Sequence, residues 1–202
     1  MKFELMVDLV LASSSPRRHA LLSQLEIPFK TEKSEVPETV HEELIPTDFV
    51  QKLAIQKAED VYFRHKDSLI LGADTIVAFE GEVLHKPVDR QQAKRYLQRL
   101  SGNTHQVHTG VAFIDRNGVT SFVSTVNVTF KEIQEELIDA YIDSGDPFDK
   151  AGGYGIQTLG GLFVQSIEGD YNTVVGLPLT KVFDFLYQNG KIRVKGGGNH
   201  PA

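Results

Sequence analysis

The stretch LASSSPRRHALL, residues 11–22, marks a change from strand to helix. An apolar run ends in three serines, and Pro16 then opens a helix for which Ser15 is the expected N-cap. Arg17 and Arg18 fall in the first turn of that helix. The unpaired N–H groups and the helix dipole disfavour a cation there by about 0.3–1 kcal/mol, so two adjacent cations at this place need an explanation.

A phosphate or polyphosphate is the anion that fits this arrangement. The N–H donors, the helix dipole and two guanidinium groups all converge on one spot. A single arginine usually meets only solvent or a carboxylate, but a pair at a helix start favours a ligand. The common phosphate motifs do not account for it, because the Walker sequence is absent and Gly153-x-Gly155 is followed by Thr158 where a dinucleotide fingerprint requires glycine.

Composition narrows the class of protein. The 202 residues are 41% hydrophobic and 24% charged, which is ordinary for a globular chain, and no apolar run approaches the roughly 20 residues that cross a bilayer. A net charge of −6 argues against nucleic acid and anionic membranes as partners. The absence of cysteine excludes disulfides and thiol nucleophiles, and Glu4 and Asp8 interrupt the apolar N-terminus, so we expect no signal peptide and a cytoplasmic location.

Strands and helices alternate along the chain, which predicts an α/β fold with a mixed β-sheet flanked by helices. Residues 1–190 are expected to form one domain, and residues 191–202 a flexible C-terminal tail. Thr47 is the expected N-cap of a long helix and Asp89 that of the next helix, and a hairpin turn is expected near Glu80-Gly81. We also expect a break in a buried strand at Gly72–Asp74 and a strand at residues 171–175.

Three polar residues outside the first helix are candidates for a cleft. Asp74 follows the apolar residues 69–71 and a small two-residue step, so it is expected at a strand end, where α/β proteins bind ligands. The alternative is that Asp74 or Thr75 merely closes a turn. Lys86 follows a strand that can return alongside Asp74. Lys57 shares a helical stripe with apolar residues, so its side chain either extends to solvent or reaches a phosphate in the cleft.

Residues 149–161 contain five glycines, which either mark ordinary turns or let a loop approach a flat ligand. Gln157 in this segment offers the donor and acceptor pair that can recognise the edge of a base. His105 and His108 form a weak metal motif, because alternation along a strand directs the two imidazoles to opposite faces.

Four sequence blocks, LASSSPRR, GADTIV…GEVLHKP, LSGNTHQVHTG and DPFDKAGGYGIQ…IEGDYNTVVGLP, follow one another between about Leu9 and Leu186. In this order they resemble the Maf family of nucleoside triphosphate pyrophosphatases. The resemblance implies two lobes around a central cleft, a shape related to inosine triphosphate pyrophosphatases, and a homodimer. It also implies cleavage between the α and β phosphates that depends on a divalent cation, Mg²⁺ or Mn²⁺.

The resemblance further assigns roles to single residues. Asp74 is the catalytic residue, which activates water or helps to hold the metal, and Glu38 is the second metal ligand. Pro37 stands where relatives often have an acid, which leaves Glu35 as the alternative. Thr75 after the aspartate resembles the dTTP/UTP branch, whereas the 7-methyl-GTP branch is expected to carry Gln. Substrate choice is assigned to Arg17, Thr75 and Gln157, and the phosphate site to Ser13, Arg18, Lys57 and Lys86.

We therefore expect hydrolysis of dTTP and UTP, or of modified pyrimidine nucleotides, to the monophosphate and pyrophosphate. The alternative is a nucleotide-binding regulator of cell division or septum formation with little turnover. The acid–base site favours an enzyme, because a sensor needs cations but no carboxylate that activates water. Binding of single-stranded nucleic acid is disfavoured, because the chain is acidic and lacks a basic tract with interleaved aromatic residues.

Overall fold

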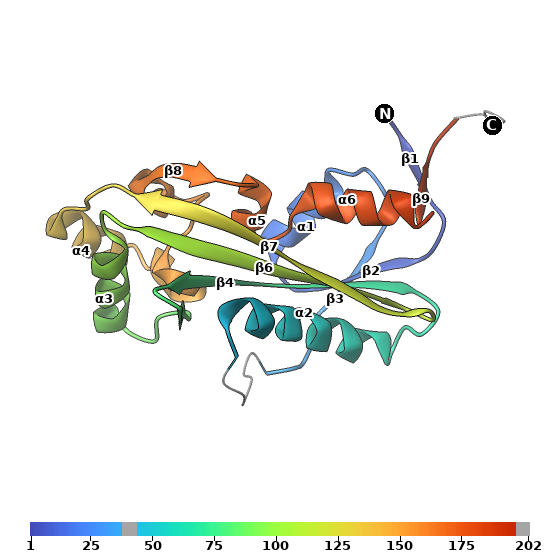
Figure 1. Cartoon of the computed structure of the whole chain (residues 1–202), viewed down its shortest axis with the longest axis horizontal. Helices are drawn as coiled ribbons and strands as arrows, with labels where there is room; N and C mark the ends of the chain where they lie inside the picture. The colour runs from blue at the N-terminus through green and yellow to red at the C-terminus, as the bar shows by residue number, and fades with distance from the viewer. Residues whose placement is uncertain (38–43, 197–202) are drawn as a thin grey trace.

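The computed structural model describes residues 1–37 and 44–196. Its centre is a seven-stranded mixed sheet with strand order β3-β2-β4-β6-β7-β8 and β5 paired to β4 (Figure 1). The strands are β1 (Phe3–Leu5), β2 (Leu9–Ala12), β3 (Lys30–Glu32), β4 (Leu69–Phe79), β5 (Glu82–Leu84), β6 (Thr104–Asp115), β7 (Gly118–Phe130), β8 (Val164–Glu168) and β9 (Ile192–Val194). The helices are α1 (Pro16–Ser23), α2 (Pro46–Tyr62), α3 (Arg90–Leu100), α4 (Glu135–Asp143), α5 (Tyr171–Val175) and α6 (Leu179–Gln188), with the short 3₁₀ helices η1 (Asp146–Asp149), η2 (Ala151–Gly153) and η3 (Leu159–Phe163).

Helices cover both faces of this sheet, so the predicted mixed sheet flanked by helices is confirmed. Strand β2 runs parallel to β3 and β4, and the other pairings are antiparallel. Alternate residues of β2 and β4 pack on opposite sides, Leu11 and Leu71 in the core under α1 and α6, and Val10 and Ile70 against α2. The long strands β4, β6 and β7 continue beyond this region to a second core.

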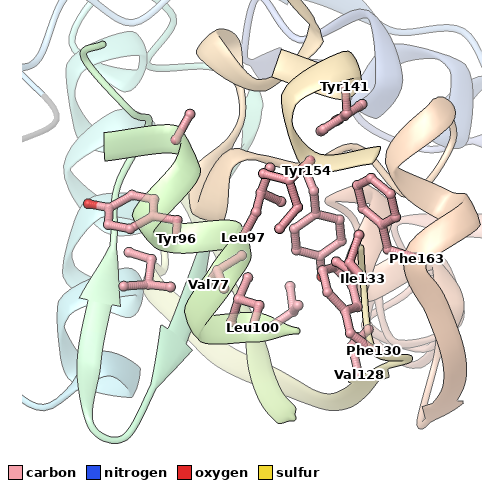
Figure 2. Close-up of a cluster of buried hydrophobic side chains, with 14 of the residues drawn as sticks. Val77, Tyr96, Leu97, Leu100, Val128, Phe130, Ile133, Tyr141, Tyr154 and Phe163 are labelled. Carbon is pink, nitrogen blue, oxygen red and sulfur yellow. The ribbon is translucent and has the colours of Figure 1, made fainter. Parts of the chain in front are cut away.

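The second core lies at the far end of the long strands, under α3 and α4 (Figure 2). Its centre is a group of aromatic rings, in which Phe130 meets Tyr154 edge-on at 4.8 Å and Phe163 at 6.1 Å between ring centroids. Leu97 and Leu100 from α3 are fully buried against them. The two cores thus build the two ends of the molecule between which a cleft can open.

The predicted break at Gly72–Asp74 is wrong, because β4 continues through these residues without interruption. Gly72 serves a different purpose, since a Cβ placed on it would lie 2.5 Å from the carbonyl oxygen of Ala54 in α2. Gly110 in β6 makes an equally close approach to the carbonyl oxygen of Val50. Both glycines let α2 pack directly on the backbone of the sheet, as glycine does where two elements come close.

Two further local predictions are wrong for reasons of capping. Thr47 is inside α2, whose N-cap is Ile45 and whose first turn begins with Pro46. Residues 171–175 form helix α5 rather than a strand. Asp170 is its N-cap and accepts a hydrogen bond of 2.9 Å from the backbone N–H of Asn172, which outweighs the strand propensity of the valines that follow.

The predicted flexible tail, residues 191–202, is wrong for its first part. Ile192–Val194 form β9, which pairs with β1 in the register Leu5↔Ile192, and Ile192 is buried. Residues 197–202 lie outside the part that the structure describes. No helix in residues 1–37 or 44–196 has the length and apolar character needed to cross a membrane.

Candidate active site

A cleft of about 950 Å³ opens between the two cores, so the expected central cleft is present. Its walls come from the turn between β2 and α1, from α2, from the middle of β4, from the residues after β5 and from the loop around η1 and η2. Every predicted site residue that the structure describes lines it: Ser13, Arg17, Arg18, Lys57, Asp74, Thr75, Lys86 and Gln157. Glu38 lies outside the described residues.

The turn between β2 and α1 is held by its serines. Ser15 is the N-cap as predicted, and its hydroxyl accepts from the backbone N–H of Arg18 at 3.4 Å. The Ser13 hydroxyl accepts from the backbone N–H of Ser15 at 3.1 Å. Ser13 is nearly buried and also lies 3.5 Å from Nη1 of Arg18. The serines therefore fix the start of the helix, and with it the positions from which both arginines extend.

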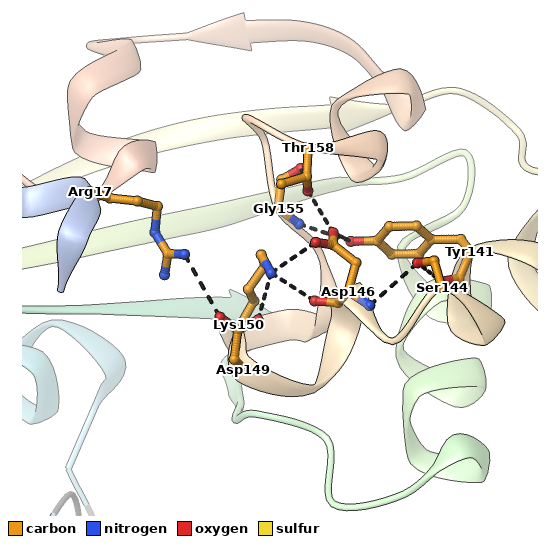
Figure 3. A network of polar contacts seen from close by, with 8 residues as sticks. All are labelled: Arg17, Tyr141, Ser144, Asp146, Asp149, Lys150, Gly155 and Thr158. Carbon is orange, nitrogen blue, oxygen red and sulfur yellow. Dashed lines mark hydrogen bonds and ion pairs between the residues drawn. The ribbon is translucent and has the colours of Figure 1, made fainter. Parts of the chain in front are cut away.

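The two arginines face the same cleft but differ in how they are held. Arg17 is 42% exposed, and its Nη1 lies 4.0 Å from Oδ2 of Asp149 on the opposite wall (Figure 3). An exposed pair of this length contributes little to stability and leaves Arg17 available to an anion. Arg18 is anchored more firmly, because its Nε donates to the carbonyl oxygen of Gly176 at 2.8 Å and its Nη2 donates to Thr75 at 3.1 Å.

Asp74 lies at the floor of the cleft, in the middle of β4 rather than at a strand end as predicted. It is 7% exposed, and its Oδ1 is 2.5 Å from Nζ of Lys57. Each side chain of this pair is 11% exposed. Lys57 thus reaches the cleft, which was one of the two possibilities for this residue. Its ammonium group compensates a carboxylate charge that would be costly to bury alone.

Oxygen ligands for a divalent cation are available beside this pair. Among the described residues, Glu35, Asp74 and Asp149 are the carboxylates that line the cleft, and of these Asp74 alone is buried. In residues 1–37 and 44–196 no group of three or more His, Cys, Asp or Glu could hold a metal by itself. Carboxylates and phosphates are the ligands that Mg²⁺ prefers, and one or two carboxylates suffice when a bound triphosphate supplies the others. Asp74 together with Glu35 or Asp149 therefore fits a divalent cation that binds along with a triphosphate.

The glycine-rich loop that carries Gln157 is held by a polar network around Asp146 (Figure 3). Oδ2 of Asp146 accepts from the hydroxyl groups of Tyr141 and Thr158, each at 2.5 Å. The Tyr141 oxygen in turn accepts from the backbone N–H of Gly155 at 3.1 Å. A Cβ on Gly155 would lie 2.4 Å from Oγ1 of Thr158, so a side chain there would displace Thr158 from the network. The network places exposed Gln157 at the cleft wall.

These contacts shift the pKa values of both acids in the network. Burial, and the hydrogen bond that Tyr141 donates to Asp146, raise the pKa of the Tyr141 hydroxyl. Burial also raises the pKa of Asp146, but hydrogen bonds from Thr158, Tyr141 and Lys150 outweigh that effect and lower it. Asp146 is therefore an ionised acceptor at neutral pH, and Tyr141 stays protonated and continues to donate.

His105 and His108 have separate partners, as expected for opposite faces of a strand. His105 is 2% exposed, and its Nε2 lies 2.7 Å from the hydroxyl of Tyr154, which lines the cleft. Burial lowers the pKa of His105 to about 4. Nδ1 of His108 lies 2.9 Å from Oγ1 of Thr125, and burial lowers the pKa of His108 as well. Both rings are neutral side chains of the packed interior.

The sequence reasoning missed the residues that hold the site from behind. Asp146 and Tyr141 support the glycine-rich loop, and Thr109 lies behind Thr75 at a distance of 2.9 Å. Thr109 is fully buried in β6, and the available signal was its place directly before Gly110 and the apolar residues 111–114. Nothing in the spacing of Asp146 and Tyr141 points to a common loop.

Comparisons with known proteins identify one family for this chain. The family described as Maf-like protein matches residues 8–189. The dTTP/UTP pyrophosphatases of Bacillus cereus and Bacillus anthracis are each 49% identical over 183 residues, which is 91% of this chain and 96% of the relative. Among solved structures, the Staphylococcus aureus Ham1 protein is similar with a TM-score of 0.44 and 15% identity, over 61% of this chain and 71% of that one. From the match over residues 8–189 and these relatives, the chain belongs to the Maf family.

Proposed function

We propose that the protein hydrolyses dTTP and UTP to the nucleoside monophosphate and pyrophosphate. The observation that carries this proposal is the buried Asp74–Lys57 pair at the floor of a cleft whose walls bear Arg17, Arg18 and Lys86. A site that only bound nucleotides would need these cations, but it would not need a buried carboxylate among them. The relatives named dTTP/UTP pyrophosphatase support the choice of reaction and substrate.

The cations would bind the triphosphate along one wall of the cleft. Arg18 is held by Gly176 and Thr75 and presents a preformed donor group, which costs little ordering when a phosphate arrives. Arg17 and Lys86 are exposed and can close on the terminal phosphates. Phosphoryl transfer requires mainly positioning and charge neutralisation, which these groups supply.

Asp74 would accept the proton of the attacking water. In this step the water oxygen bonds to the α-phosphorus, the bond from that phosphorus to the bridging oxygen breaks, and pyrophosphate leaves with the bridging oxygen. Lys57 keeps the carboxylate in place at 2.5 Å and compensates its charge before the reaction. Among the described residues Asp74 is the buried carboxylate of the cleft, which makes it the best-placed proton acceptor.

A divalent cation, Mg²⁺ or Mn²⁺, is part of the proposal. Asp74 would hold it together with the phosphates, with Glu38 or Glu35 as the second carboxylate; Glu35 lines the cleft. When bound, the cation supplies charge neutralisation on the phosphates and lowers the pKa of a water ligand. The family resemblance also supports a homodimer and a cytoplasmic location, and light scattering of the purified protein tests the dimer.

The base would meet the loop that carries Gln157. A carboxamide has one acceptor and two donor hydrogens, which can pair with the complementary edge of uracil or thymine. Thr158 restrains this loop through its hydrogen bonds to Asp146 at 2.5 Å and to the carbonyl oxygen of Gly155 at 3.0 Å. The proposal therefore assigns discrimination between bases to a loop that is held in one conformation.

A panel of nucleoside triphosphates tests the reaction. dTTP, UTP, dCTP, ATP and GTP are each incubated with the protein and Mg²⁺ or Mn²⁺, and modified pyrimidine nucleotides are included. The expected products from dTTP and UTP are the monophosphate and pyrophosphate in equal amounts, with kcat/KM at least about tenfold above the purine nucleotides. Release of nucleoside diphosphate and phosphate would contradict the proposal, and tight binding without turnover would favour the regulator.

A further inference from the structure

A line of hydroxyl groups runs from Arg18 into the interior of the protein. Nη2 of Arg18 donates to Oγ1 of Thr75 at 3.1 Å, and this oxygen lies 2.9 Å from Oγ1 of Thr109. Thr109 in turn donates to the backbone carbonyl oxygen of Thr173 at 2.7 Å. Thr109 and Thr173 are fully buried, so water does not compete for the bond between them, whereas Thr75 and Arg18 line the cleft.

The direction of every bond in this line is fixed by its two ends. The carbonyl oxygen of Thr173 can only accept, so the single hydroxyl hydrogen of Thr109 is committed to it. The bond between Thr75 and Thr109 must therefore be donated by Thr75. Arg18 can only donate, and the Thr75 oxygen accepts from it. Protons thus point in one direction along the line, from the guanidinium group to the Thr173 carbonyl.

This direction limits what Thr75 can do in the cleft. Its only hydroxyl hydrogen is used by Thr109, so Thr75 has no proton to offer a phosphate oxygen. What Thr75 offers Arg18 is a lone pair at a fixed place, and the carbonyl oxygen of Gly176 offers a second one to Nε at 2.8 Å. Two acceptors at fixed positions define the plane of the guanidinium group.

We propose that Thr109 is a positioning residue for Arg18, acting through Thr75 to hold the guanidinium group in the orientation that binds the phosphates released as pyrophosphate. This rests on the proposed function. The framework is rigid, because Thr75↔Thr109 and Thr109↔Ser124 are register partners across β4, β6 and β7. Removing the Thr109 hydroxyl frees the hydrogen of Thr75 to turn into the cleft and leaves the acceptor for Arg18 without a fixed direction.

Three variants separate this role from a merely structural one. Thr109→Val keeps the shape and removes the hydroxyl, whereas Thr109→Ser keeps the hydroxyl. Ser124→Ala is the matched control, since the Ser124 hydroxyl is also buried and accepts from Oγ1 of Thr173 at 3.0 Å, but on a branch that does not lead to Arg18. The readouts are the melting temperature, kcat and KM for dTTP, and the dissociation constant of inorganic pyrophosphate with Mg²⁺ by calorimetry.

We expect Thr109→Val to weaken pyrophosphate binding and to lower kcat/KM for dTTP by about tenfold each, as for the loss of a positioned contact. Thr109→Ser and Ser124→Ala stay within about twofold of the parent, although Ser124→Ala lowers the melting temperature as Thr109→Val does. If Thr109→Val does not fold, Thr109→Ala takes its place with the same expected loss.

Binding of pyrophosphate by Thr109→Val within twofold of the parent would overturn the proposal, and so would an equal loss in Ser124→Ala or Thr109→Ser. The pyrophosphate measurement does not require turnover. A parent protein that binds pyrophosphate but does not hydrolyse dTTP therefore contradicts the proposed function alone, and the Thr109 variants still decide the role of Thr109. A parent protein that hydrolyses dTTP but does not bind pyrophosphate overturns the role proposed for Thr109 and leaves the proposed function standing.

Discussion

Acidification is expected to destabilise the protein through His105, which lies under the glycine-rich loop. Burial lowers the pKa of His105 from 6.5 to about 4 in the folded protein. Between these two values the unfolded chain takes up a proton that the folded protein does not bind, so the free energy of unfolding falls as the pH falls. At about 1.4 kcal/mol per pKa unit, the full loss below pH 4 amounts to about 3 kcal/mol.

Urea unfolding of the parent and of His105→Gln at pH 7.5 and pH 4.5 measures this loss. Glutamine does not titrate, and its side chain can still bond the Tyr154 hydroxyl. The parent should lose about 2–3 kcal/mol more than the variant between the two pH values. His108, whose pKa burial also lowers, is present in both proteins and cancels in the difference. Equal losses in the two proteins would show that His105 does not titrate as its burial requires.

Further substitutions test the floor, the wall and the loop of the cleft. Lys57→Met leaves the Asp74 carboxylate buried without the ammonium group that lies 2.5 Å from it. Thermal unfolding should show a loss of about 1–3 kcal/mol in the free energy of unfolding. An unchanged melting temperature would contradict the pairing. Gln157→Ala should lower kcat/KM for dTTP by about 10- to 100-fold. The melting temperature should stay unchanged, because Gln157 is exposed. An unchanged preference among bases would show that Gln157 does not recognise the base. Thr158→Gly removes a hydroxyl bonded to Asp146 and frees the loop. Urea unfolding should then show a loss of about 1–2 kcal/mol in the free energy of unfolding, and the KM for dTTP should rise. A KM equal to that of the parent would argue against restraint of the loop by Thr158.

Local signals with a direct chemical partner were the most predictable part of the fold. Ser15 and Asp89 are N-caps as expected, because each side chain accepts from a backbone N–H within its own first turn. The turn at Glu80-Gly81 was also predictable, and both residues have positive φ, at 54° and 81°. In each case the partner lies within three residues, so the sequence contains both halves of the interaction.

Predictions that depended on distant packing were less secure. The sequence around Gly72 predicts a break in the strand, but the backbone of α2 packs against Gly72 and the strand continues. Ile192 follows the last helix in a tail of mostly polar residues and glycines, yet β1 from the other end of the chain supplies its strand partner. Neither α2 nor β1 can be identified as a neighbour from the residues around these positions.

The same distinction between local signals and distant packing applies to the candidate site. Arg17 and Arg18 were identified from their conflict with the helix dipole, and both line the cleft. The partner of Lys57 was not identified, because Lys57 and Asp74 are 17 residues apart and meet only when α2 packs on β4. Thr109 was missed for the same reason, since its role depends on strand register.

The most direct test of the account is the rate at which Asp74→Asn hydrolyses dTTP with Mg²⁺. The asparagine has the same shape and its carbonyl can still accept from Lys57, but it can neither take the proton of water nor carry a charge. We expect kcat to fall by about 10²- to 10⁴-fold while the protein stays folded and continues to bind pyrophosphate. Hydrolysis at the parental rate by this variant would contradict the assignment of Asp74 and with it the proposed chemistry of the cleft.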